Sequence, residues 1–126
     1  PLDLTELTPI NKDINSDDTQ IVYGKGFDHN WVLNSNGDIS QIAAEVYDKL
    51  SGRRMEVYTD KPGLQFYSGN MIKSSQIGKY DVHYKVRSGF CLETQFFPNA
   101  MKHKHFPSPI LEAGKEYKYK TIYKFV

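Results

Sequence analysis

The sequence predicts an all-β protein, built as an antiparallel β-sandwich. Three observations indicate this fold class. Segments that alternate between apolar and polar residues are short, Gly and Pro recur between them, and aromatic residues are frequent, with nine Tyr, seven Phe and one Trp among 126 residues. A chain of this length suits one domain with its own core rather than two.

The first half of the chain begins with a loop and continues as strands. Residues 1–20 are polar and rich in Asp, Asn and Thr, which predicts little regular structure. Residues 27–33 are a strand candidate, and the Asn-Gly-Asp sequence at 36–38 is a turn signal. Residues 42–48 fit a helix or a strand by their period alone. We expect a strand there, because the Ser-Gly turn at 51–52 comes too soon for a full helix.

The middle of the chain reads as two strands joined by a tight turn. Residues 54–59 alternate cleanly and predict the first of these strands. Residues 60–63 fit a type II turn in which Gly63 takes a positive φ. Residues 64–67 predict the second strand, whereas residues 71–86 have no clear pattern and are expected to be mostly loop.

The last strand, predicted over residues 116–126, has the clearest alternation. Prolines at 98, 107 and 109 require a loop before it. One face is aromatic and is expected in the core: Tyr117, Tyr119, Thr121, Tyr123 and Phe125. The other face is expected in water: Lys118, Lys120, Ile122 and Lys124. An antiparallel sheet with one buried face requires this division.

Composition argues against several functions. The formal net charge of +1 gives no indication of a nucleic-acid-binding or membrane-surface protein. No apolar run is long enough to span a membrane, and no signal peptide is visible. The single cysteine excludes an internal disulfide, and a reducing, cytoplasmic compartment fits that count. The first residue is Pro1 rather than Met, which suggests part of a longer or processed protein.

Glu93 lies in the middle of a predicted strand, residues 89–98, and its position needs an explanation. It shares the polar face of that strand with Cys91 and Gln95. An unpaired carboxylate is costly to bury. A solvated sheet face or a structural ion pair would explain Glu93. The alternative is a general base that faces a ligand pocket.

Four segments resemble the galactose mutarotase (aldose 1-epimerase) family, in the order in which that family has them. They are Gly-Phe-Asp-His-Asn at 26–30, Ser-Gly-Arg at 51–53, Pro-Gly-Leu-Gln-Phe-Tyr-Ser-Gly-Asn at 62–70 and Cys-Leu-Glu-Thr-Gln at 91–95. The resemblance covers nearly all of the chain from about Gly24 onward. It implies the large β-sandwich of that family, the mutarotase supersandwich. Residues 1–126 are then the C-terminal half of one aldose 1-epimerase domain, and the N-terminal half of the same enzyme is an expected partner.

The resemblance also implies a reaction and three site residues. The reaction interconverts the α and β anomers of a free hexose such as galactose or glucose by acid/base ring opening, without a metal or organic cofactor. Glu93 matches the catalytic base of the family. Asp28 matches a carboxylate that accepts hydrogen bonds from sugar hydroxyls, and Gln65 matches an amide that lines the same pocket. Without the resemblance, a turn cap is the favoured explanation of Asp28, and a solvated sheet position is the favoured explanation of Gln65.

One part of the catalytic machinery has no counterpart here. The general acid of the family is a His in an Asn-His motif, and no such motif occurs in these residues. We therefore expect the chain alone to have little or no mutarotase activity and to expose sheet surface that the N-terminal half covers. Two alternatives stay open: a non-catalytic carbohydrate-binding module, and a purely structural β-domain.

The remaining candidates have simpler explanations. His29 is expected to be structural, because it faces away from Asp28 on a strand. His103 and His105 could bind a metal, but no cysteine or carboxylate cluster supports such a site, so exposed loop histidines are expected. Trp31 is expected in the core, and Cys91 is expected to be a small buried apolar residue.

Overall fold

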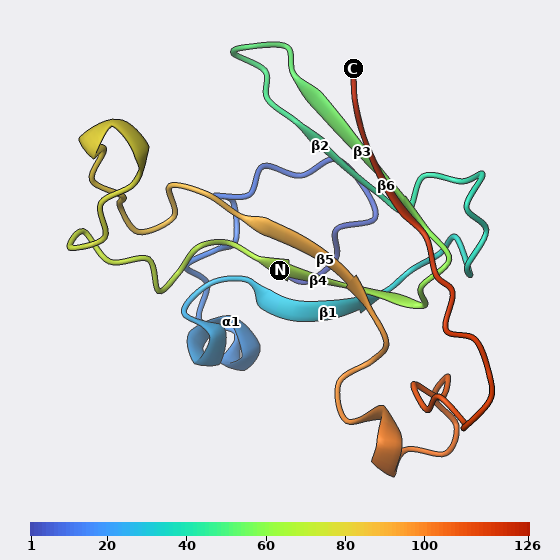
Figure 1. The fold of residues 1–126 in the computed structure, drawn as a ribbon. Coiled ribbons are helices and arrows are strands. Elements are labelled where there is room, and N and C mark those ends of the chain that lie inside the picture. Colours follow the sequence, from blue (N-terminus) through green and yellow to red (C-terminus); the bar gives the residue numbers. More distant parts are fainter. The chain divides into compact units, whose positions relative to one another are not determined.

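A computed structural model describes all 126 residues and confirms the all-β fold class (Figure 1). Six short strands form two three-stranded sheets, ordered β1-β4-β5 and β2-β3-β6. The strands are β1 (Asp28–Val32), β2 (Ala44–Tyr47), β3 (Arg54–Thr59), β4 (Gly63–Tyr67), β5 (Cys91–Gln95) and β6 (Thr121–Phe125). Helical structure is limited to α1 (Thr19–Gly24) and two 3₁₀ turns at Lys79–Asp81 and Ala100–Lys102.

The chain divides into two compact units. Unit 1 consists of residues 1–29 and 65–93, and unit 2 consists of residues 30–64 and 94–126. Each unit combines segments that are far apart in the sequence. The three predicted site residues, Asp28, Gln65 and Glu93, all belong to unit 1.

The core of unit 1 forms around two stacked aromatic rings. Phe27 and Phe66 are both buried, with ring centroids 5.3 Å apart, and Ile14 and Ile21 are buried in the same unit. Segments that are far apart in the sequence cover these side chains. The burial of their apolar surface is the main source of stabilisation in a small unit.

Residues 1–18 contain no helix or strand, in line with the loop predicted for residues 1–20, and only the last two residues of that range belong to helix α1. Asp18 caps its N-terminus and accepts hydrogen bonds from the backbone N–H groups of Gln20 (2.8 Å) and Ile21 (3.4 Å). The helix ends at Gly24, and the C-cap residue Lys25 adopts a left-handed conformation. A helix of six residues is too short to show a periodic apolar pattern, so the cap was its only signal in the sequence.

Unit 2 contains the β2-β3-β6 sheet, with β3 in the centre. Both pairings are antiparallel, and in this register Glu56 lies opposite Glu45 on one side and Lys124 on the other. Val57 and Thr59 of β3 are completely buried. The strand predicted at residues 42–48 is confirmed as β2.

The predicted turn at residues 60–63 is wrong in its conformation. Gly63 does not have a positive φ and lies within β4. A Cβ atom at this position would come within 2.7 Å of Asn30 Oδ1 and 3.0 Å of Phe97 Cδ1. Gly63 is therefore required by side-chain packing and not by turn geometry.

The last strand is shorter and more exposed than predicted. Pairing begins at Thr121, not at residue 116. The aromatic face expected in the core is partly in water, since Phe125 is 74% and Tyr123 is 45% exposed. The physical reason is that β6 is an edge strand, while the buried positions of the sheet lie on its centre, β3.

Candidate functional site

Two of the three predicted site residues contact each other directly. Gln65 Nε2 donates a hydrogen bond to Asp28 Oδ1 over 2.8 Å. Gln65 lies on β4 and Asp28 on β1, and these strands are neighbours in their sheet. Both side chains are half-buried. The amide thus orients one oxygen of a carboxylate that is still partly accessible to a ligand.

Glu93 lies on β5, on the other side of β4, and its side chain is exposed. Partial burial, the charge and hydrogen bond of Glu93, and then the charge of Asp28 raise the pKa of the Cys91 thiol above its ordinary value. Glu93 and Asp28 therefore both act on the same sulfur atom. All three predicted residues belong to unit 1, and their roles in binding and catalysis stay predictions.

Cys91 is exposed, which corrects the prediction of a buried residue. It shares a face of β5 with Glu93, and alternation along the strand keeps that face away from the core. Its raised pKa keeps the thiol protonated at neutral pH, so it is a poor nucleophile.

A buried polar network that sequence reasoning missed fixes the ends of β1 and β4. Ser68 Oγ accepts a hydrogen bond from the N–H of Phe27 (3.0 Å) and donates one to Asn70 Oδ1 (2.7 Å). Asn70 Nδ2 donates to the carbonyl oxygens of Gly24 and Phe27, each over 2.9 Å. Because Asp28 follows Phe27 directly, this network holds the backbone next to the carboxylate. In the sequence, the signal for this network was the presence of two polar residues, Ser68 and Asn70, at the end of an apolar strand.

His29 has a structural role, as predicted. Its Nδ1 accepts a hydrogen bond from the backbone N–H of Asp28 (3.1 Å), which leaves Nε2–H to donate to the carbonyl oxygen of Gln20 (3.1 Å). His29 therefore ties α1 to β1.

The remaining candidates do not form a further site. His103 and His105 are exposed and contact the Phe106 ring. No three His, Cys, Asp or Glu side chains lie close enough together to hold a metal ion. Trp31 is half-buried, not fully buried as expected of a core residue.

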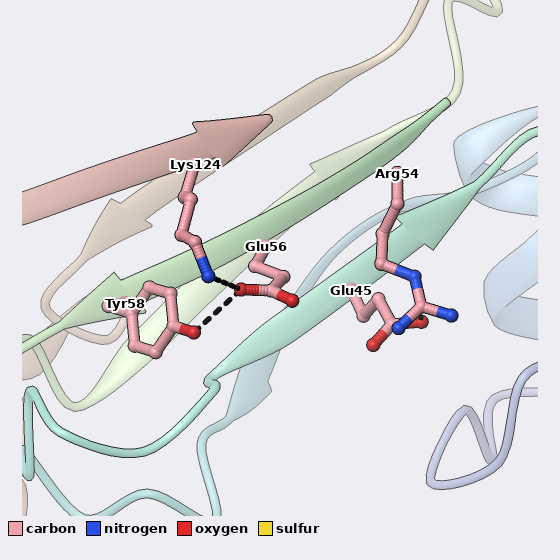
Figure 2. A network of polar contacts seen from close by, with 5 residues as sticks. All are labelled: Glu45, Arg54, Glu56, Tyr58 and Lys124. Atoms are coloured by element: carbon pink, nitrogen blue, oxygen red, sulfur yellow. Dashed lines mark hydrogen bonds and ion pairs between the residues drawn. The ribbon is translucent and has the colours of Figure 1, made fainter. Parts of the chain in front are cut away.

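Unit 2 carries a second set of carboxylates, shown in Figure 2, whose contacts indicate a structural role. The buried Glu56 carboxylate accepts hydrogen bonds from Tyr58 Oη (2.7 Å) and Lys124 Nζ (3.0 Å), and Arg54 Nε lies 3.5 Å from Glu45 Oε1. The hydrogen bonds from Tyr58 and Lys124 hold the pKa of Glu56 below its ordinary value. A carboxylate that is already engaged in this way is poorly suited to act as a base.

The sequence model of the aldose 1-epimerase family matches residues 1–124. The chain belongs to the aldose 1-epimerase family. Over 100 residues it is 46% identical to a galactose mutarotase from Sus scrofa and 44% identical to one from Homo sapiens; each alignment covers 79% of this chain and 29% of the relative. An aldose 1-epimerase from Escherichia coli (strain K12) is 36% identical over 104 residues, which cover 81% of this chain and 30% of that protein.

A solved structure shares the fold of this family member. It is the crystal structure of a GalM/aldose epimerase homologue from C. elegans, with a TM-score of 0.70 at 24% identity, covering 79% of this chain and 30% of that one. The chain thus spans about 30% of the length of the curated relatives it matches. None of its helices has the length and apolar character needed to cross a membrane.

Proposed function

We propose that this chain carries the catalytic base and part of the sugar site of an aldose 1-epimerase acting on a free hexose such as galactose or glucose. The observation that supports the proposal is the grouping in unit 1: Gln65 is hydrogen-bonded to Asp28, and the charges of Asp28 and Glu93 both act on Cys91. The names of the relatives, galactose mutarotase and aldose 1-epimerase, agree with this chemistry.

In the proposed reaction, Glu93 removes the proton from the anomeric hydroxyl of the sugar. The bond between C1 and the ring oxygen breaks as an acid protonates that oxygen, and the open-chain aldehyde rotates about its C1–C2 bond. Reversal of the proton transfers closes the ring on the other face. Asp28 and Gln65 hold the sugar hydroxyls during these steps, and each well-placed proton transfer contributes about 10²–10⁴ in rate.

The acid is proposed to come from the N-terminal half of the same domain. Residues 1–126 lack the Asn-His motif of the family. We therefore propose that they are the C-terminal part of a single domain and are inactive alone. We place the complete enzyme in the cytoplasm, in line with the single cysteine.

Polarimetry on freshly dissolved α-galactose and α-glucose tests the proposal. We expect no acceleration by this chain alone or by the N-terminal half of a relative alone, and acceleration when the two folded parts are mixed. Glu93→Gln should reduce the acceleration by the mixed parts about 10²–10⁴-fold. Catalysis by this chain alone that Glu93→Gln abolishes would contradict the need for a partner. No gain on mixing two folded parts would contradict the split site.

The prearranged Asp28–Gln65 pair also supports a second candidate, a carbohydrate-binding module without chemistry. This alternative predicts that galactose perturbs the amide NMR signals around Asp28 and Gln65, while Glu93→Gln changes neither affinity nor anomer exchange in the mixed parts. If a high concentration of galactose perturbs none of these amide signals, the result would favour a purely structural β-domain.

A further inference from the structure

Unit 1 contains a cavity of about 200 Å³ that the proposed sugar site does not use. Ile10, Ile14 and Phe90 form its apolar wall, and Ser68, Arg87 and Ser88 supply its polar groups. None of Asp28, Gln65 and Glu93 lines it. Alternation along the chain directs Phe90 away from the face that carries Cys91 and Glu93.

Arg87 lines this cavity with a guanidinium group that is only partly used. Its Nη1 donates a hydrogen bond to Asn15 Oδ1 (2.8 Å) and its Nη2 donates to the carbonyl oxygen of Lys25 (3.0 Å). Its Nε is buried without a hydrogen-bond partner. A guanidinium has five N–H donors, so these contacts leave donors unused.

Arg87 also has no ion-pair partner. The three ion pairs in the chain involve Lys12, Arg54 and Lys124, and none involves Arg87. The side chain is half-buried, where a positive charge without an anionic partner is unfavourable. An anion in the cavity would supply that partner.

The backbone at Arg87 has an unusual conformation that the surrounding contacts maintain. Its φ of 63° lies in the left-handed region, which favours glycine. The N–H of Arg87 donates to the carbonyl oxygen of Gly69 over 2.9 Å, which fixes the residue in this position. Strained non-glycine residues of this kind concentrate at ligand sites.

We propose that this cavity binds a small organic monoanion, a carboxylate with a short apolar tail. The carboxylate lies on the remaining N–H groups of Nη1 and Nη2 of Arg87, and one negative charge balances one guanidinium. The tail packs against Ile10, Ile14 and Phe90, which a fully polar anion such as phosphate would leave uncovered.

Butyrate and benzoate are suitable probes, titrated into the isotope-labelled chain and followed by amide NMR. We expect saturable shifts at Gly69, Ser88 and Gly89, and at least tenfold weaker effects from the neutral analogues butanol and benzyl alcohol. Equal shifts with the alcohols would overturn the role of the charge. Equal or stronger binding of inorganic phosphate would overturn the choice of a carboxylate with an apolar tail.

Arg87→Gly provides the matched variant, because glycine adopts a φ of 63° without strain and the fold should be retained. We expect it to weaken carboxylate binding at least tenfold, whereas Lys102→Gln, which removes an exposed positive charge elsewhere, should leave the affinity unchanged. Thermal shift with and without benzoate gives a second measurement of the same difference. Undiminished binding to a folded Arg87→Gly chain, or equal loss in both variants, would overturn the proposal.

Discussion

Two glutamates in the middle of strands show how surroundings decide the role of one residue type. Glu56 is buried and accepts hydrogen bonds from Tyr58 and Lys124, so its charge is satisfied within the fold. Glu93 is exposed on β5, where its carboxylate can meet a ligand. Burial and hydrogen-bond partners, not position along a strand, separate a structural carboxylate from a candidate base.

At the residue scale, we predict that Gln65→Leu weakens the sugar site by freeing Asp28. A hydrogen bond to a charged group contributes about 1.5–3 kcal/mol, so kcat/KM of the reconstituted enzyme should fall about 10–100-fold. Gln41→Leu is a matched control, because Gln41 Nε2 makes a similar 2.9 Å bond to Asp38 in an exposed turn. Equal effects of both changes on kcat/KM would contradict the site.

The hydrogen bonds that Glu56 accepts from Tyr58 and Lys124 make the stability of the folded chain depend on pH in a defined direction. The folded-state pKa of Glu56 is lowered, so its contribution is present above the ordinary value of 4.5 and is lost as the pH falls through the lower folded value. Glu56→Gln should therefore reduce Tm at pH 7 and differ little from the parent chain near pH 3. Calorimetry across this range checks the prediction, with the exposed Glu116→Gln as control. A pH-independent difference would contradict it.

At the scale of elements, the β1-β4-β5 sheet depends on a glycine, Gly63, in its central strand β4. Asn30 of β1 and Gln95 of β5 are hydrogen-bonded to each other (3.1 Å), although β4 lies between their strands. Gly63 of β4 leaves the space in which Asn30 lies. The small residue thus allows a polar contact across the width of the sheet.

We predict that Gly63→Ala destabilises the chain by about 1–3 kcal/mol, because the new Cβ would come within 2.7 Å of Asn30 Oδ1. Gly89→Ala is the matched control, since a Cβ there meets nothing within 4 Å and no unusual φ is required. Urea unfolding of both variants measures the difference. A neutral Gly63→Ala would show that Asn30 and Phe97 can move aside at little cost.

At the scale of the whole molecule, a strongly apolar edge is left in contact with water. The edge strand β6 carries Phe125, which is 74% exposed, and the segment before it carries the exposed Tyr117 and Tyr119. Exposed edges with apolar side chains favour association with another chain. The chain spans about 30% of the length of its relatives.

We therefore predict that the chain alone associates in a concentration-dependent way in sedimentation velocity. Phe125→Lys should shift the distribution toward the monomer, because a charge on an edge strand opposes pairing. Lys118→Gln, on an exposed residue outside β6, serves as control and should not reduce association. A chain that is monomeric at all concentrations would contradict this prediction.

The sequence by itself determined the fold class, the family and most strands, because these depend on local patterns. Alternation over six residues was enough to define β3, and four short motifs were enough to identify the family. A turn signal close behind residues 42–48 was enough to favour a strand over a helix. Local periodicity carries this information because side-chain direction repeats every two residues in a strand.

Only the tertiary structure decided which residues meet. Asp28 and Gln65 are 37 positions apart, and no local pattern encodes their hydrogen bond. The exposure of Cys91, the packing reason for Gly63 and the burial of Arg87 Nε without a hydrogen-bond partner likewise depend on neighbours from distant segments. Burial and polar contacts are properties of the assembled sheets, since they arise only when separate strands share one environment.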